Sequence, residues 1–255
     1  MSPAPGASVR PKSWDRSRAP MASTAPAPAR PVVVSIGGSV LLTGSDDARY
    51  IGELAELLRR LGRSLPLVVT TGGGRPARDY IRLGRELGLT EVELDEIGID
   101  VTRLNARLLA ARVGLPTPAH PPSTVAQAVH ELRHASPVIL GGTEPGHTTD
   151  GVAALVAARV RAARFVNATD VDGLYDHDPR THPGARRIDQ IWWPEFRRRV
   201  HAATSGEPGQ NFVFDRLGAD ILARAEIPLA IVQGRDLPNL EKSIQGDAFV
   251  GSRVG

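Results

Sequence analysis

The stretch GGTEPGHTTDGVAAL (141–155) joins two predicted elements of an α/β fold. The apolar run before it (137–140) predicts a buried strand, and the alanine-rich run after it (150–161) predicts a helix. Glycines that expose backbone N–H groups, hydroxyl donors and the positive end of a helix dipole together favour anion binding. The stretch therefore predicts a phosphate-binding loop. The alternative is a plain strand–helix connection in which Thr149 or Asp150 caps the helix.

Two more glycine loops follow apolar runs, which strengthens the phosphate-binding interpretation. The run 32–36 ends at two glycines (37–38), and Ser39 beside them can donate a hydrogen bond to an anion. The run 65–70 leads into three glycines (72–74). Because three consecutive glycines cost conformational entropy, they are best explained by a ligand that approaches the backbone closely.

Arg78 lies in the first turn of the helix predicted over residues 76–87. A cation at that position opposes the helix dipole, and an anion held between Arg78 and the glycines would remove the conflict. The alternative is an arginine that contacts only solvent.

A fourth loop carries carboxylates instead of glycines. Asp170 and Asp172 follow the predicted strand 164–167, and Tyr175 and Asp178 come soon after. Acidic side chains at the end of a strand suit a magnesium–nucleotide site or hydrogen bonds to a ribose. The alternative is an aspartate-rich turn.

The predicted strands and helices alternate along the chain, which predicts an α/β fold with a doubly wound, mostly parallel sheet. The chain has neither the P-loop lysine motif nor G-x-G-x-x-G, and it lacks the serine elbow of α/β-hydrolases. The predicted strands are 32–36, 65–70, 137–140, 164–167 and 228–232, and the predicted helices are 46–61, 76–87, 91–113, 124–134, 150–161, 193–201, 212–225 and 237–244.

Composition limits the possible classes of function. At 255 residues, 41% of them hydrophobic, the chain can bury a large core. Cysteine is absent, which excludes disulfides and thiolate metal sites. No apolar run approaches the ~18 residues of a membrane span, and no signal-peptide core is present. We therefore expect no membrane association and a cytoplasmic location.

The basic excess of the chain belongs to its first 30 residues. The net charge is +3, but residues 1–30 hold five basic residues and one acidic residue, so the remainder is close to neutral. This segment is rich in Pro and Ala, and we expect a disordered extension before a single domain over 31–255. Because the domain is not basic and only 4% of residues are aromatic, nucleic-acid binding is not expected.

The order of these loops resembles the amino-acid kinase superfamily, and within it the UMP kinases of the archaeal type. The matching segments are SIGGSV (35–40), GGGRPARDYI (72–81), LDEIGI with TRLNA (94–106), GGTEPGHTTD (141–150), and NATDVDGLY with DP (167–179). The resemblance implies a three-layer αβα sandwich. The nucleoside monophosphate would lie over its N-terminal half and ATP over its C-terminal half.

The resemblance also implies roles for individual residues. The catalytic group would be Asp150, which orders the reacting groups, with Gly38 and Ser39, which hold the phosphoryl group in transfer together with Gly37. The acceptor would be bound by Gly73, Gly74, Arg78, Asp95 (on the ribose), Thr143, His147 and Thr148. ATP would be bound by Thr169, Asp170, Asp172, Tyr175 and Asp178, on the same side as Gly37. Mg²⁺ would accompany ATP without an assigned protein ligand, and the chain would form a homo-oligomer, a dimer or a hexamer.

Two positions depart from this pattern. Ser35 stands where many superfamily kinases have lysine, although archaeal-type UMP kinases can lack it, and Asp220 stands where related UMP kinases often have lysine. The only lysines are residues 12 and 242, so none can stand in. Three functions therefore stay open. They are phosphoryl transfer from ATP to UMP, a same-fold kinase for another phosphate-bearing or small acid substrate in specialised metabolism, and a non-catalytic nucleotide- or oxyanion-binding protein like the molybdenum-storage proteins.

Overall fold

The computed structural model describes residues 29–115, 120–179, 181–204 and 213–255. The predicted extension over residues 1–30 lies outside the described residues, apart from its last two. Residues 205–212 also lie outside the described residues.

The central element is a seven-stranded sheet in the order β3-β2-β1-β4-β8-β9-β7. The first five strands in this order run parallel, and β9 is antiparallel to β8. The mostly parallel sheet predicted from the sequence is therefore confirmed. Its strands are β1 (Val32–Ile36), β2 (Leu67–Thr71), β3 (Val138–Leu140), β4 (Arg164–Thr169), β7 (Gln190–Ile191), β8 (Leu229–Gln233) and β9 (Ser252–Val254), and a separate hairpin consists of β5 (Leu174–Tyr175) and β6 (Arg187–Ile188).

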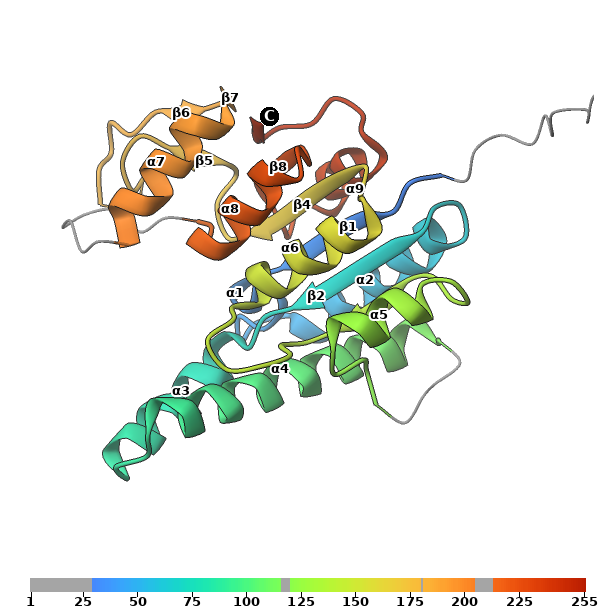
Figure 1. Ribbon diagram of the computed structural model, residues 1–255, viewed down its shortest axis with the longest axis vertical. Helices are drawn as coiled ribbons and strands as arrows, with labels where there is room; N and C mark the ends of the chain where they lie inside the picture. The colour runs from blue at the N-terminus through green and yellow to red at the C-terminus, as the bar shows by residue number, and fades with distance from the viewer. Residues whose placement is uncertain (1–28, 116–119, 180, 205–212) are drawn as a thin grey trace, which may run out of the picture.

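Helices cover both faces of the sheet, so the predicted three-layer αβα architecture is confirmed (Figure 1). α2, α4 and α9 pack on one face, α5, α6, α7 and α8 pack on the other, and α3 packs along α4. The helices are α1 (Gly38–Leu41), α2 (Asp47–Gly62), α3 (Gly74–Glu86), α4 (Glu91–Val113), α5 (Val125–Glu131), α6 (Thr149–Val160), α7 (Trp193–Thr204), α8 (Arg216–Arg224) and α9 (Leu237–Gln245). Within the ranges that the structure describes, no helix is both long and apolar enough to cross a membrane.

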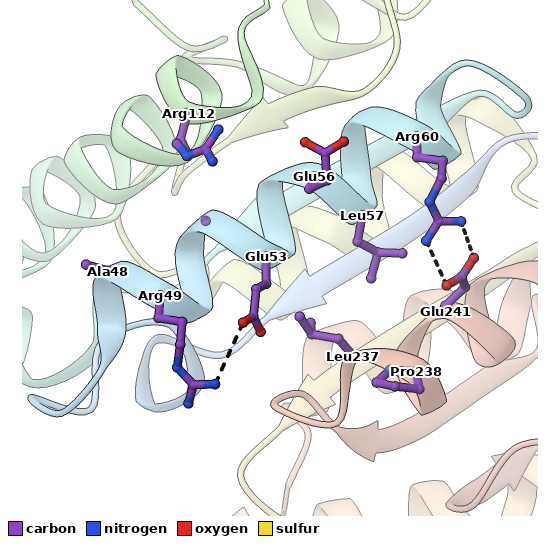
Figure 2. Close-up of a pocket in the computed structure, with 11 residues that line it drawn as sticks. Ala48, Arg49, Glu53, Glu56, Leu57, Arg60, Arg112, Leu237, Pro238 and Glu241 are labelled. Carbon is purple, nitrogen blue, oxygen red and sulfur yellow. Dashed lines mark hydrogen bonds and ion pairs between the residues drawn. The ribbon is translucent and has the colours of Figure 1, made fainter.

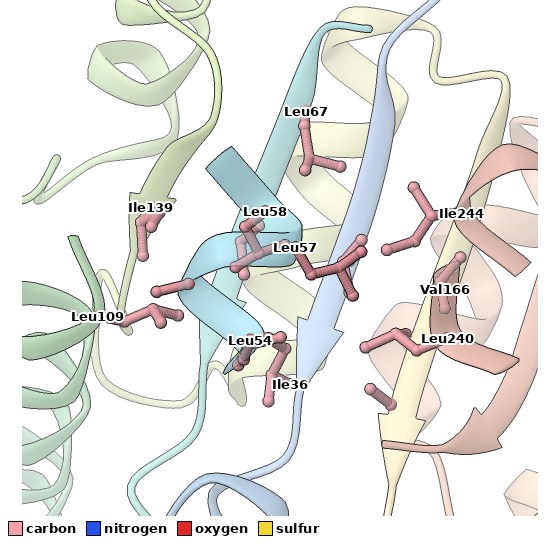
Figure 3. Packing of buried hydrophobic residues seen from close by; sticks show 14 of the residues in the cluster. Ile36, Leu54, Leu57, Leu58, Leu67, Leu109, Ile139, Val166, Leu240 and Ile244 are labelled. Carbon is pink, nitrogen blue, oxygen red and sulfur yellow. The ribbon is translucent and has the colours of Figure 1, made fainter. Parts of the chain in front are cut away.

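Alternation along the buried strands explains the two helical layers. In β1, Val32, Val34 and Ile36 belong to the core shared with α2 and α9, whereas Val33 belongs to the core shared with α6. Successive side chains of a strand point to opposite faces of the sheet. Figure 3 shows the first of these cores, where Leu54 of α2 packs beside Ile36. Burial on both faces accounts for the continuous apolar runs in the sequence.

The chain adds strands first on one side of β1 and then on the other. It places β2 and then β3 on one side of β1, and α6 returns it to β4 on the other side. The carboxyl ends of β1 and β4 therefore flank a topological switch point, where open α/β sheets bind ligands. The glycine loops and the aspartate loop follow the parallel strands at this same edge.

Most predicted elements match the structure within a few residues, and the differences have local causes. The sequence predicts a helix from residue 212, and this start is wrong because residues 213–215 are not helical. α8 begins at Arg216 because the Asp215 side chain caps it by accepting from the Gly218 N–H (2.8 Å). The sequence does not predict α1 or the short strands β5, β6, β7 and β9. Elements of two to four residues are too short to carry a hydrophobic period, so they depend on partners distant in the sequence.

Candidate active site

Three buried polar side chains form a row across the middle of the sheet. Ser35 in β1 is in register with Thr70 in β2 and with Asn167 in β4, and all three are buried. By strand alternation Ser35 shares the face of Val33, which is the face covered by α6. The row therefore lies beneath the start of α6, near the carboxyl ends of the strands.

Asp150 extends this row from the sheet to α6. The N-cap of α6 is Thr148, whose hydroxyl accepts from the Gly151 N–H (3.0 Å), so the alternative that Thr149 or Asp150 caps the helix is wrong. The Asp150 carboxylate instead accepts from the Ser35 hydroxyl (2.5 Å), and Ser35 in turn accepts from Thr70 (3.2 Å). These bonds fix Asp150 in the first turn of α6, directly above the end of β1.

The Asp150 carboxyl has a strongly perturbed acidity. Its pKa is raised to about 7: burial is the largest cause, the hydrogen bond from Ser35 lowers the pKa, and the neighbouring Asp215 carboxylate raises it. Part of the residue is still open to solvent. A half-buried carboxyl that changes charge near neutral pH, placed at a switch point, is typical of an active site.

The glycine loops after β1 and β2 pack directly against each other. A Cβ atom on Gly38 would lie 2.0 Å from the Gly74 backbone nitrogen, and one on Gly72 would lie 2.4 Å from the Gly38 nitrogen. The two loops therefore face each other. The immediate reason for glycine at these positions is contact between the two backbones, in addition to the ligand approach expected from the sequence.

Arg78 provides an uncommitted positive charge beside these loops. Because α3 begins at Gly74, two residues before the predicted start, Arg78 lies at the start of the second turn and not in the first turn. Its side chain is exposed and makes no hydrogen bond or ion pair with any residue in the described part of the chain. No acidic residue lies in the first turn of α3. The helix N-terminus and Arg78 thus leave a positive potential next to Gly73 and Gly74.

The loop between β3 and α6 carries two buried polar atoms without hydrogen bonds, Thr143 Oγ1 and His147 Nδ1. His147 Nδ1 lies 3.1 Å from a carboxylate oxygen of Glu144. The loop is held from outside by Asp95, whose carboxylate accepts from the Gly146 N–H (2.8 Å). A buried hydroxyl without a hydrogen bond, like that of Thr143, is uncommon, and a ligand with acceptor oxygens would satisfy it.

The N-termini of α6 and α8 meet at one hydrogen bond. The Thr148 hydroxyl donates to Asp215 Oδ2 (2.7 Å), and the other oxygen of Asp215 caps α8. The hydroxyl of Thr148 therefore already has partners on both sides. This contact places the start of α8 beside the start of α6, and so beside Asp150.

The aspartate loop after β4 is organised by contacts between side chains. Asp172 accepts from the Tyr175 hydroxyl (2.7 Å) and from Arg187 (2.8 Å). Burial raises the pKa of Asp172, but these two hydrogen bonds outweigh burial and hold the pKa below its usual value. Thr169 donates to Asp170 (3.3 Å), and the carbonyl oxygen of Asp178 accepts from the Thr181 and His182 N–H groups, which closes a turn.

Asp220, one of the two departures from the family pattern, is neutralised within the structure. It accepts from Arg197 Nε (2.6 Å) and lies 3.1 Å from His201 Nε2. Burial raises the pKa of Asp220, and these two partners lower it by more. The only described lysine, Lys242, lies on α9 and not at the glycine loops. The positive charges available near the switch point are therefore guanidinium groups and helix N-termini.

A separate groove of about 770 Å³ runs between α2 and α9, with Arg112 of α4 at its rim (Figure 2). Arg60 of α2 bridges to Glu241 of α9 across it, with one N–O distance of 2.8 Å, and Arg49 lies 3.7 Å from Glu53. None of the residues predicted to bind phosphate lines this groove. It is a surface feature with mixed charge, distinct from the loops at the sheet edge.

Several residues that build the site were not singled out from the sequence. Thr70 donates to Ser35, Asn167 lies opposite Ser35 on β4, and Thr102, Arg103 and Asn105 of α4 contact the glycine loops. The detectable signal was a polar side chain inside an otherwise apolar strand, just before a glycine or aspartate loop. For α4 the signal was the segment TRLNA, which matched the family without a stated role.

The sheet edge thus holds opposed glycine loops, converging helix N-termini and a half-buried carboxylate, an arrangement in an α/β protein that favours the binding of anions such as phosphate. The chain belongs to the amino acid kinase family, whose model matches residues 30–233. The resemblance stated from the sequence is therefore confirmed.

Individual relatives match the chain along nearly their whole length. The chain is 36% identical to the uridylate kinase of Methanobrevibacter smithii over 223 residues, which cover 88% of this chain and 98% of the relative. It is 41% identical to the uridylate kinase of Thermoplasma volcanium over 228 residues, which cover 88% and 96%. Among solved structures, the uridylate kinase from Archaeoglobus fulgidus matches with a TM-score of 0.78 at 37% identity, covering 88% of this chain and 99% of that one. The UMP kinase from Bacillus anthracis, with a TM-score of 0.72 at 19% identity, shares the fold.

Proposed function

We propose that this chain transfers the γ-phosphoryl group of ATP to UMP, giving ADP and UDP. The observation that carries the proposal is the direct contact between the glycine loops after β1 and β2, beside Asp150 at the switch point. The similarity to uridylate kinases over most of both chains supports UMP as the acceptor.

The reaction needs positioning and charge neutralisation more than covalent chemistry. An oxygen of the UMP phosphate forms the new bond to the γ-phosphorus. The bond from that phosphorus to the β–γ bridging oxygen breaks, and its electron pair leaves with ADP. We assign Gly37, Gly38 and Ser39 to the phosphoryl group in transfer, because their loop follows the central strand β1. Asp150 would order the reacting groups from the first turn of α6.

We assign the phosphate of the acceptor to the loops after β2 and β3. Gly73, Gly74 and Arg78 would bind it from one side, and Thr143 and His147 from the other. Two observations support this assignment. Arg78 has no partner among the described residues, and Thr143 Oγ1 and His147 Nδ1 are buried without hydrogen bonds.

Asp95 and Thr148 have a double role in this proposal. One oxygen of Asp95 holds the Gly146 N–H, which leaves the other oxygen for the ribose of the acceptor. Thr148 contributes by capping α6 and by joining it to Asp215, so its effect on the acceptor runs through the position of the loop.

We assign ATP to the C-terminal half, at the loop after β4. Thr169, Asp170 and Asp178 would contact the nucleotide. Asp172 and Tyr175 would shape the same loop, because each is the hydrogen-bond partner of the other.

Mg²⁺ fits this site as a partner of the ATP phosphates. Among the residues that the structure describes, no group of three or more His, Cys, Asp or Glu side chains could hold a metal ion. An ion carried by phosphates needs only one or two protein carboxylates, and Asp150 can supply one. When bound, the ion neutralises negative charge on the phosphates.

We also propose that the chain forms a homo-oligomer, a dimer or a hexamer. α3 and its C-cap expose Tyr80, Leu83 and Leu87, which recur on one helical face, and α4 exposes Leu104 and Leu108. Leu87 is 71% exposed and Leu104 is 64% exposed. Exposed apolar surface of this kind is typical of subunit contacts. Light scattering on the purified chain should give a mass of two or six subunits, and a monomer at micromolar concentration would contradict the proposal.

A coupled assay of ADP release, run over nucleoside monophosphates and small acids, tests the proposed activity. We expect kcat/KM for UMP to exceed that for any other acceptor by at least about tenfold. The relatives reported above favour neither alternative function. Turnover of only a non-nucleotide acid would nevertheless indicate a same-fold kinase for another substrate. Tight ATP binding without turnover would indicate a non-catalytic nucleotide-binding protein. The cytoplasmic location expected from the sequence stays a prediction.

A further inference from the structure

One turn of α4 contacts both loops that we assign to the acceptor. Asn105 Nδ2 donates to the carbonyl oxygens of residues 72 and 73, at 2.8 and 3.3 Å. Arg103 donates to the carbonyl oxygens of residues 142 and 143, at 3.1 and 3.0 Å. Two side chains within one turn of the helix therefore hold the carbonyl sides of two different loops.

Holding the carbonyl side of a loop determines where its N–H groups point. In a trans peptide unit the C=O and the following N–H point in opposite directions. The peptide units of this loop are trans, because the only cis bond in the described part of the chain is Ser136–Pro137. The N–H groups of Thr143 and Glu144 therefore point away from Arg103. Neither has a hydrogen-bond partner among the residues that the structure describes.

The same loop carries the buried Thr143 Oγ1, which also has no hydrogen-bond partner. One hydroxyl and two consecutive backbone N–H groups are thus left without partners among the described residues, in a loop whose carbonyls at residues 142 and 143 bond to α4. Consecutive N–H groups of this kind form a concave site for an anion. Leaving the buried Thr143 hydroxyl unpaired costs free energy, which a phosphate would recover.

The Arg103 guanidinium hydrogen-bonds to carbonyl oxygens of this loop and makes no hydrogen bond to a carboxylate among the described residues. Its side chain is 33% exposed, and its nearest acidic partner, Asp100, lies 3.7 Å away and is 79% exposed. Its third hydrogen bond also goes to a carbonyl oxygen, that of Ser123 (3.4 Å). A guanidinium that bonds to carbonyl oxygens further polarises the peptide units and strengthens their N–H groups as donors.

Backbone packing holds the loop in place against α4. The Thr102 hydroxyl accepts from the Gly142 N–H (2.7 Å), and a Cβ atom on Gly141 would lie 2.6 Å from the Arg103 nitrogen. The loop therefore rests on the helix backbone itself. Arg103 sets the orientation of the peptide units that follow this contact.

We propose that Arg103 is a positioning residue for the acceptor: it turns the peptide units between residues 142 and 144 so that their N–H groups bind the acceptor phosphate. This inference rests on the proposed function, since it concerns the same acceptor. Arg103 acts through the loop, without touching the substrate.

The test compares Arg103→Ala with Arg107→Ala in the full-length chain. Arg107 is the matched control, because it is an exposed arginine one turn further along α4 that has no partner among the described residues. We expect Arg103→Ala to raise KM for UMP at least about tenfold while KM for ATP changes less than twofold. Guanidinium at low millimolar concentration should restore part of the loss. Arg103→Lys should be intermediate, since an ammonium lacks the planar fork that reaches two carbonyls. Arg107→Ala should have the same KM for UMP and for ATP as the wild type.

Two results would overturn the inference. One is an unchanged KM for UMP in Arg103→Ala. The other is a parallel rise of both KM values with a lowered melting temperature and no rescue by guanidinium, which marks general structural damage. If the wild-type chain does not phosphorylate UMP, the proposed function fails separately. The comparison is then made on the acceptor that the wild type turns over best or, without turnover, on calorimetric binding of inorganic phosphate, where equal affinities of wild type and Arg103→Ala would end the inference.

Discussion

The loops assigned to the acceptor and the loop assigned to ATP are built in different ways. In the acceptor half, backbone packs on backbone, as at Gly38 and Gly74, and α4 side chains hold carbonyl oxygens. In the ATP half, side chains hold one another, as Asp172 does with Tyr175 and Arg187. A contact between two backbones leaves no room for a side chain, whereas a side-chain pair can rearrange. The difference indicates that substitutions in the acceptor half should cost more than those in the ATP half.

The largest effect should come from Gly38→Ala. Because the new Cβ would lie 2.0 Å from the Gly74 nitrogen, the two loops must separate, and the alignment of donor and acceptor is lost. We expect kcat/KM to fall at least about 1,000-fold, since displacements near 1 Å already cost about 100-fold. The control is Gly88→Ala, which has nothing within 4 Å of its Cβ and should keep full activity with a small loss of stability from its φ of +80°. Near wild-type activity of a folded Gly38→Ala variant would show that loop contact is not required.

Asp150→Asn should lower kcat about 100-fold and leave both KM values within about threefold, because it removes a charge that acts on the reacting groups. The amide can still accept from Ser35, so the link to β1 is kept. Asp247→Asn, at an exposed aspartate just after the C-cap of α9, serves as the control. Full turnover of Asp150→Asn would show that this carboxylate serves only as a structural link between β1 and α6.

Arg78→Ala should raise KM for the acceptor at least about tenfold and change KM for ATP little, because a cation facing an anion is lost. Arg82→Ala, one turn further along α3, is the matched control. Its exposed side chain lies 3.5 Å from Asp79 and 3.8 Å from Glu86. Steady-state kinetics with both substrates varied gives the comparison, and an unchanged acceptor KM would remove Arg78 from the site.

Arg187→Ala tests the ATP half and should have a weaker effect. Asp172 loses one of its two hydrogen-bond partners but keeps Tyr175, so the loop should loosen without collapsing. We expect KM for ATP to rise about threefold to tenfold and KM for UMP to stay constant. Arg186→Ala, which removes the neighbouring exposed side chain, is the control. A fall in activity as large as that of Gly38→Ala would contradict the contrast between the two halves.

The smallest effect concerns stability and pH in the absence of ligands. The pKa of Asp150 is raised to about 7 in the folded chain, against about 3.9 for an aspartate in an unfolded chain. As pH rises from about 4 to about 7 the unfolded chain loses this proton first, so Asp150 destabilises the fold increasingly over that interval. Asp150→Asn should therefore melt a few degrees above wild type at pH 8.5, and the difference should vanish near pH 4. A constant difference across pH would show that the carboxyl is not perturbed.

The sequence predicts the sheet and its loops because their patterns are local. Val32–Ile36 is apolar except for Ser35 and is followed by glycine, so the strand and its turn are both visible in the residues. Asp150 and Arg78 could be selected as candidates because a helix N-terminus favours one sign of charge. The short elements β7 and β9 could not be predicted, since two or three residues carry no period and exist only through pairing.

The contacts that organise the site depend on positions distant in the sequence. Asn105 and the Gly72 carbonyl are 33 residues apart, and Ser35 and Asp150 are 115 apart, so no local pattern connects them. Asp172 follows the predicted strand as expected, but its partner Arg187 comes from the second strand of a hairpin that the sequence did not predict. Side-chain partners of this kind follow from the fold and become visible only once the strands are placed.

The central claim is that the opposed glycine loops hold two phosphorylated molecules at once. A crystal structure with UMP and a non-hydrolysable ATP analogue bound together tests it most directly. We predict the UMP phosphate within hydrogen-bond distance of the Gly73 and Thr143 N–H groups, and the terminal phosphate of the analogue at the loop that contains Gly38. Phosphates bound elsewhere, for instance in the groove between α2 and α9, with the two glycine loops separated from each other, would contradict it.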